Sequence, residues 1–113
     1  MDEKILKWLY DIRNAINEID DYFANVPLDF THYKNNTSLK RAVERDLEII
    51  GEAVKRILNN DPNFPIETAR RIVGLRNQII HAYDNISDEN IWAIIIKHLP
   101  LLKNEVTNLI KTN

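Results

Sequence analysis

The stretch SLKRAVERDLEIIGEAVKRILN, residues 38–59, decides the fold. Its large apolar residues recur at intervals of three or four, which places them on one face of an α-helix: Leu39, Val43, Leu47, Ile50, Val54 and Ile57. Thr37 or Ser38 can cap the start of this helix, and the sequence NNDP at residues 59–62 ends it. The pattern predicts a long amphipathic helix whose apolar face packs against a core.

Towards the N-terminus, residues 3–23 show the same periodicity. Their apolar stripe consists of Ile5, Leu9, Ile12, Ile16, Ile19 and Phe23. Residues 24–36 have no clear period and contain Pro27. We therefore expect a long connection there, partly packed through Phe30 and Tyr33.

Towards the C-terminus, Pro65 opens a third helical segment. We expect Gly74 to interrupt it, so that a second short helix covers residues 75–83. Ser87 can cap a fourth helix, and Pro100 is expected to start the last one. No stretch carries a strong strand signal. The predicted fold is therefore all-α, an up-and-down bundle of four to five helices.

Composition narrows the functional classes. The chain has 113 residues, which fits one domain over residues 1–113, and 44% of them are apolar. No apolar run reaches the ~20 residues of a membrane span, and the start lacks the form of a signal peptide, so we expect a cytoplasmic protein without a membrane partner. There is no cysteine, and the net charge is −2. Any contact with nucleic acid must therefore be local.

One stretch, RNQIIHAY at residues 76–83, combines groups that can do chemistry. On a helix of 100° per residue, Arg76, Asn77, Ile80 and His81 share one face, separate from the apolar stripe. Tyr83 lies about 20° from Arg76 around the axis. An isoleucine among these polar groups favours a two-fold dimer contact that also lines a polar cleft and doubles the arginine and the histidine.

Such a cleft could cleave RNA without a metal. A histidine would deprotonate the ribose 2′-hydroxyl, and arginines would stabilise the charge on the phosphate. Asn77, one turn before His81, could orient the imidazole or hold a phosphate oxygen. From the residues alone, the plainer alternative is an ordinary ion pair for Arg76 and a satisfied hydrogen bond for His81.

The pattern Arg76-x4-His81-x-Tyr83, with Asn77 after the arginine, resembles the signature of HEPN domains. More closely, the chain resembles the HepT toxin family. Residues 42–53, Gly74 before the motif, Trp92 and the Leu-Pro-Leu step at residues 99–101 are also similar to that family. The resemblance covers nearly the whole chain and is best over residues 42–102.

The resemblance implies an all-helical, HEPN-like homodimer whose paired motifs form a cleft. It implies a metal-independent endoribonuclease, without cofactors, that is the toxin of a toxin–antitoxin pair. The implied antitoxin is an MntA-like nucleotidyltransferase that silences the toxin by adenylylating the motif tyrosine. Carried over to this sequence, Arg76 and His81 are catalytic, Asn77 assists them, and Tyr83 is the modification site.

Other polar residues have simpler interpretations. Arg45 and Glu52 lie in residues 42–53, the stretch that is similar to the HepT family. For both, an ion pair that braces the motif helix is favoured over a direct catalytic role. Arg70 and Arg71 could steer RNA, or could equally belong to a solvated face. His32 and His98 are isolated from each other and from acidic ligands, so no metal site is expected, and the helix dipole is a simple explanation for His98.

Two functions compete with the ribonuclease. The first is a non-catalytic HEPN helical module that partners a nucleotidyltransferase and positions its substrate. The second is a purely structural dimerisation bundle. The intact Arg76, His81 and Tyr83 favour the enzyme over the structural bundle but do not separate it from the binding module.

Overall fold

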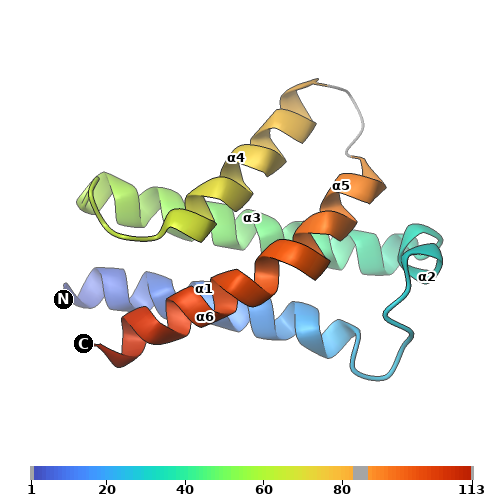
Figure 1. The fold of residues 1–113 in the computed structure, drawn as a ribbon, viewed down its shortest axis with the longest axis horizontal. Helices are drawn as coiled ribbons and strands as arrows, with labels where there is room; N and C mark the ends of the chain where they lie inside the picture. Colours follow the sequence, from blue (N-terminus) through green and yellow to red (C-terminus); the bar gives the residue numbers. More distant parts are fainter. Residues whose placement is uncertain (1, 83–86, 113) are drawn as a thin grey trace.

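The computed structural model describes residues 2–82 and 87–112, and for residue 76 and residues 78–82 it describes only the backbone. All regular structure in these residues is helical (Figure 1). The elements are α1 (Glu3–Tyr22), α2 (Phe30–Lys34), α3 (Thr37–Asn60), α4 (Glu67–Ala82), α5 (Asp88–Ala93), a π-helical turn η1 (Ile94–His98) and α6 (Leu99–Lys111). The predicted all-α class is confirmed.

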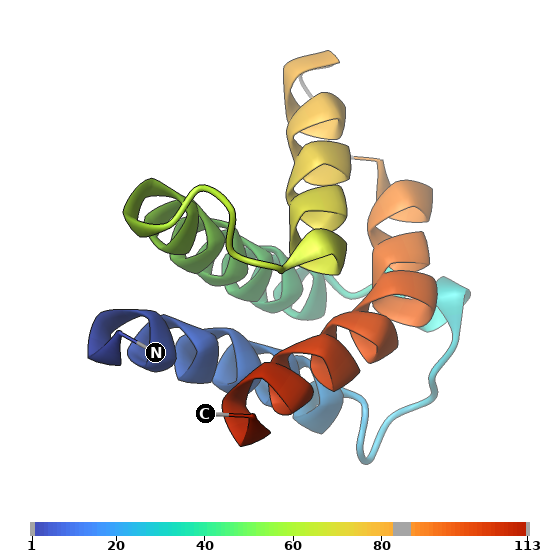
Figure 2. The same ribbon diagram turned by 60° about the vertical axis from the view of Figure 1, so that its left-hand side comes forward.

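The core forms where the predicted apolar stripes meet. α1 and α3 run antiparallel to each other, and α6 lies against α1 (Figures 1 and 2). Every member of the stripe predicted in residues 38–59 is buried, as are five of the six predicted in residues 3–23. Phe23, the sixth, is half-buried and packs edge-on against Trp92 at a ring-centroid distance of 5.8 Å. The side chains that fill this core are Ile5, Leu9, Ile12, Ile16, Ile19, Val43, Leu47, Ile50, Val54, Ile57, Ile72, Ile91, Ile94, Leu102 and Val106.

The connection between α1 and α3 is more ordered than predicted. It contains the five-residue helix α2, which Asp29 caps by accepting a hydrogen bond from the His32 N–H. Tyr33 in this helix is fully buried, and its ring lies 5.5 Å from that of Trp92. The aromatic cluster therefore fixes the connection, although the sequence has no period there. Asn36, and not Thr37 or Ser38, caps α3 through the Leu39 N–H.

Helix α4 corrects the prediction of a break at Gly74. The helix runs without interruption through this residue, whose backbone has no positive φ. Glycine in a helix interior costs roughly 1 kcal/mol relative to alanine, which is too little to break a helix that tertiary contacts support. α4 packs on α3 near its start, and its C-terminal end projects beyond the other helices (Figures 1 and 2).

The helix predicted to start at Pro100 also differs. α5, η1 and α6 form one continuous helical stretch, in which Pro100 lies inside the first turn of α6. Pro100 has no N–H to donate, and the turn before it is widened: the Leu99 N–H bonds to the Ile94 carbonyl, five residues back. The wide turn accommodates the proline, so the chain does not break. Ser87 caps α5 as predicted, by accepting from the Asn90 N–H.

Across residues 2–82 and 87–112, every helix is too short or too polar to span a bilayer.

Candidate active site

Two polar contacts fix the start of α4. The Thr68 N–H, in the first turn, donates to Glu105 Oε2 of α6 over 3.2 Å. A carboxylate at this position satisfies a free helix N–H and complements the positive end of the helix dipole. Arg70 Nη2 donates to the Pro62 carbonyl over 2.6 Å, which ties α4 to the loop from α3. Both contacts fix the direction in which the rest of α4 projects.

The motif lies in the second half of this helix. Arg76, Asn77 and His81 all belong to α4, so the expectation of a single helix carrying them agrees with the backbone. Helix geometry places Asn77 and position 81 one turn apart on one face, and positions 76 and 81 about 7.5 Å apart along the axis. The side chains of Arg76, Ile80 and His81, and the whole of Tyr83, lie outside the described residues. The predicted grouping of these side chains therefore stays a prediction.

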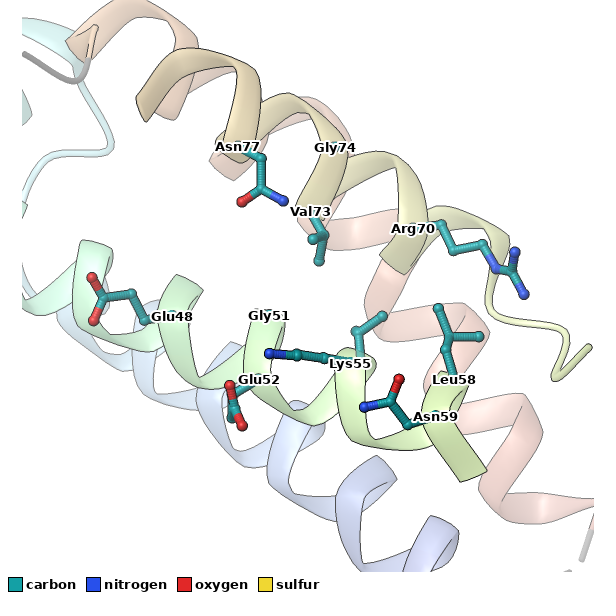
Figure 3. A pocket seen from close by; sticks show the side chains of 11 residues that line it. Glu48, Gly51, Glu52, Lys55, Leu58, Asn59, Arg70, Val73, Gly74 and Asn77 are labelled. Atoms are coloured by element: carbon teal, nitrogen blue, oxygen red, sulfur yellow. The ribbon is translucent and has the colours of Figure 1, made fainter. Parts of the chain in front are cut away.

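Asn77 is exposed and has a defined environment. It lines a groove of about 780 Å³ between α3 and α4, and its side chain extends towards α3 (Figure 3). The volume falls within the range of small-molecule sites, roughly 300–1,000 Å³. The residues that line the groove are Glu48, Gly51, Glu52, Val54, Lys55, Leu58, Asn59, Arg70, Val73, Gly74 and Asn77. The groove therefore extends along α4 to the position next to Arg76.

Three further charged residues from the sequence analysis, Arg45, Glu52 and Arg71, lie on the surface of α3 and α4. Glu52 pairs with Arg56 over 3.3 Å, an i,i+4 pair within α3, and both side chains are about half exposed. This pair lies within α3, and an ion pair that braces the motif helix stays a prediction, because the side chains of Arg76 and His81 lie outside the described residues. Arg45 is exposed and lies next to Asp46; burial raises the pKa of that carboxyl, and the Arg45 charge offsets the rise only in part. Arg71 is exposed near the start of α4.

Sequence reasoning missed a buried carboxylate. Asp46 is 1% exposed, and its Oδ2 accepts a hydrogen bond of 2.6 Å from the Tyr22 hydroxyl of α1. Burial and a hydrogen bond with the Glu18 carboxyl raise the pKa of Asp46 to about 6. The one available signal is its position, three residues after Val43 and four before Ile50, which places Asp46 on the edge of the apolar stripe.

The two other histidines outside the motif have buried nitrogens. His32 Nε2 and His98 Nδ1 make no hydrogen bond in the described part of the chain. The helix-dipole explanation for His98 is wrong, because this residue lies inside the continuous η1–α6 stretch and not at a free helix end. Within residues 2–82 and 87–112, no three His, Asp or Glu side chains are grouped so that they could hold a metal ion.

Comparison with known families decides the relationship. The model of the family described as "Ribonuclease HepT-like" matches residues 12–109. The chain belongs to the HepT-like ribonuclease family. The match includes α3, all of α4 and the motif at residues 76–83, so the resemblance inferred from the sequence is confirmed.

Individual relatives cover most of the chain. The protein named "Putative RNase MJ1380" of Methanocaldococcus jannaschii is 39% identical over 101 residues, which cover 88% of this chain and 90% of that protein. "Probable ribonuclease HepT" of Thermococcus cleftensis is 31% identical over 105 residues, with coverage of 92% and 94%. "Putative RNase TTE0752" of Caldanaerobacter subterraneus is 33% identical, with coverage of 74% and 76%. No solved structure matches the chain.

Proposed function

We propose that this protein is an endoribonuclease that acts as the toxin of a toxin–antitoxin pair. Membership of the HepT-like ribonuclease family carries the proposal, together with the motif Arg76, Asn77 and His81 on a single helix. The relatives named as ribonucleases, which cover most of both chains, support the same activity.

The proposed reaction needs no metal. His81 takes the proton from a ribose 2′-hydroxyl, and the resulting oxygen attacks the adjacent phosphorus. Arg76 stabilises the negative charge that gathers on the phosphate oxygens, and Asn77 holds one of these oxygens or the imidazole. The bond to the 5′-oxygen breaks, and that oxygen takes a proton from the second histidine. The products are a 2′,3′-cyclic phosphate and a free 5′-hydroxyl.

The second histidine comes from a second copy of the chain. We propose a homodimer in which the two α4 helices face each other at a cleft. The projection of the α4 end beyond the other helices supports this arrangement (Figure 2). Ile80→Glu places like charges at the contact and should shift the dimer towards monomer. A wild-type protein that sediments as a monomer at high concentration rules the arrangement out.

Control comes from a nucleotidyltransferase antitoxin that adenylylates Tyr83. An AMP group at this position places a phosphate beside Arg76 and fills the cleft, so RNA is excluded by charge and by volume. This part of the proposal rests on the family resemblance and on the spacing of seven residues, which sets positions 76 and 83 at nearly the same angle on a helix.

The decisive experiment measures cleavage of a labelled RNA by the wild type, Arg76→Ala and His81→Ala. We expect each variant to lose about 10²–10³ in rate or more, with unchanged circular dichroism. Wild-type cleavage should persist in EDTA and leave 2′,3′-cyclic ends. Activity that EDTA abolishes and Mg²⁺ restores would contradict the mechanism. A folded wild type that binds but never cleaves RNA would favour the non-catalytic binding module.

A further inference from the structure

We propose that the groove between α3 and α4 binds an unpaired stretch of RNA next to the cleavage position, with Lys55 in contact with a phosphate. This proposal rests on the proposed ribonuclease function and assigns it a substrate subsite. The groove reaches Asn77, the neighbour of Arg76, and position 81 lies one helical turn further along α4. A strand that lies in the groove therefore leads directly to the motif.

The chemistry of the lining fits a nucleotide. Two half-buried aliphatic side chains, Leu58 and Val73, offer an apolar surface for the face of a base. The amides of Asn59 and Asn77 carry donors and acceptors for base edges or ribose hydroxyls (Figure 3). These two aliphatic groups, one on each helix and among polar residues, form no continuous stripe, which a docked amphipathic helix would need. The lining thus favours RNA over a helix of a second copy.

The charged residues that line the groove indicate where a phosphate of the RNA would bind. Lys55 is exposed and pairs with no acidic group in the described part of the chain, so its ammonium is available to a ligand. The carboxylate of Glu52 is already paired with Arg56. Arg70 adds a second cation on the α4 side of the groove. The lining also holds the carboxylates of Glu48 and Glu52, so a phosphate in the groove would bind at Lys55 and Arg70.

Glycines keep the groove open. The chain has two glycines, Gly51 on α3 and Gly74 on α4, and both line the groove. Neither has a positive φ, and each lies inside a helix, where glycine is unfavourable by roughly 1 kcal/mol relative to alanine. A Cβ at Gly74 would meet no atom within 4 Å, and one at Gly51 would make an ordinary contact with Val73 at 3.9 Å. Packing within the chain therefore does not require a glycine at either position. An RNA strand that lies close to the backbones of both helices does require one at each.

The two glycines also provide the experiment. Protein labelled with ¹⁵N-glycine gives only two backbone amide signals, one from each wall of the groove. A short unstructured RNA oligonucleotide is titrated into the labelled His81→Ala variant, which keeps the substrate intact. We expect both signals to shift. The Gly51 signal is the decisive test of binding in the groove, because Gly51 lies on a different helix from the motif. In a second sample labelled with ¹⁵N-tryptophan, the indole signals of Trp8 and Trp92, neither of which lines the groove, serve as controls and should stay in place.

Two variants test the contacts. Lys55→Gln should reduce the slope of log K against log salt by about 0.7, the value for one phosphate contact on a single strand. Lys111→Gln, an exposed lysine at the end of α6, is the matched control and should leave the slope unchanged. Gly74→Leu, whose Cβ would meet no atom within 4 Å, should abolish the RNA-induced shift of Gly51 while the circular dichroism stays unchanged.

The outcomes separate this proposal from the ribonuclease function. RNA cleavage by the wild type without any shift at Gly51 overturns the groove and leaves the ribonuclease intact. A shift at Gly51 that depends on Lys55, in a protein that never cleaves RNA, supports the groove and overturns the ribonuclease. Glycine signals that move on dilution of the protein and not on addition of RNA would assign the groove to a second copy, and overturn the proposal.

Discussion

The Tyr22 hydroxyl donates a hydrogen bond of 2.6 Å to Asp46 Oδ2, and this contact joins α1 to α3 through a carboxylate that is 1% exposed. The bond lowers the pKa of Asp46, against the larger raising effects of burial and of Glu18. The same bond raises the pKa of Tyr22 to about 12. The pair therefore stabilises the ionised form of a carboxyl group that burial disfavours.

Tyr22→Phe should destabilise the protein more at pH 8 than at pH 5. Above pH 6 Asp46 is ionised, and a hydrogen bond to a buried charge contributes about 1.5–3 kcal/mol, whereas one to the neutral acid contributes about 0.5–1.5 kcal/mol. Urea unfolding of both proteins at the two pH values measures the difference. Equal losses at both values would show that the bond does not depend on the charge of Asp46.

Asp46→Asn should flatten the pH dependence of stability between about pH 4 and pH 6. The pKa of Asp46 is raised from 3.8 to about 6, so the folded state binds the proton more tightly than the unfolded state. The resulting stability is fully present below pH 3.8 and is lost as the pH rises through 6. Asparagine does not titrate, so the variant should lack this loss. Thermal melts across the range, with the exposed Asp21→Asn as control, measure the effect; parallel curves would contradict the assignment.

Tyr33→Phe, in contrast to Tyr22→Phe, should not destabilise the folded protein. The Tyr33 hydroxyl is buried and has no hydrogen-bond partner in the described part of the chain, and burial raises the pKa of this phenol. Removal of a buried polar group that makes no bond relieves a desolvation cost of about 1–3 kcal/mol. We expect the variant to be as stable as the wild type or more stable in urea unfolding. A loss above about 1 kcal/mol would reveal a hydrogen-bond partner for this hydroxyl.

Tyr83→Phe should keep most of the ribonuclease activity and escape the antitoxin. In the proposed mechanism the phenol is neither acid nor base, so its loss leaves cleavage intact, but it removes the oxygen that AMP would modify. Intact-mass measurement after incubation with the nucleotidyltransferase and ATP should show added AMP on the wild type only. AMP on Tyr10, Tyr22 or Tyr33, or a Tyr83→Phe variant as inactive as His81→Ala, would contradict this account.

The apolar period of the sequence was sufficient to predict the two long helices α1 and α3 and the face that each buries. Local signals were less reliable where tertiary contacts compete with them. Gly74 lies inside a helix because its intrinsic cost is small beside the packing of α4, and Pro100 is accommodated by a wider turn. The α2 segment has no period, since its order comes from aromatic contacts of Tyr33 and Phe30 with Trp92, which is distant in sequence.

Of the residues predicted to form the site, Arg76, Asn77 and His81 lie on one helix, α4, whereas Tyr83 lies outside the described residues; the site itself stays a prediction. The groove could not be predicted, because it depends on how α4 crosses α3 and brings Lys55 near Asn77. Asp46 was missed for a different reason. Its neighbours Arg45 and Glu48 are exposed and charged, and no sequence period distinguishes a buried carboxylate from an exposed one at the edge of a stripe.

The widened turn at Ile94–His98 has a consequence for changes in chain length. Its bond from Leu99 to Ile94 spans five residues, so deletion of one exposed residue, Ile96 or Lys97, converts it to the four-residue bond of a regular helix. The helices on either side then keep the faces that they bury, provided that Pro100, which only the wide turn accommodates, is replaced as well. Homologous chains that are shorter by one residue in this turn can therefore preserve the same core, and alignments of the family should place a gap there before any other position in this long helix.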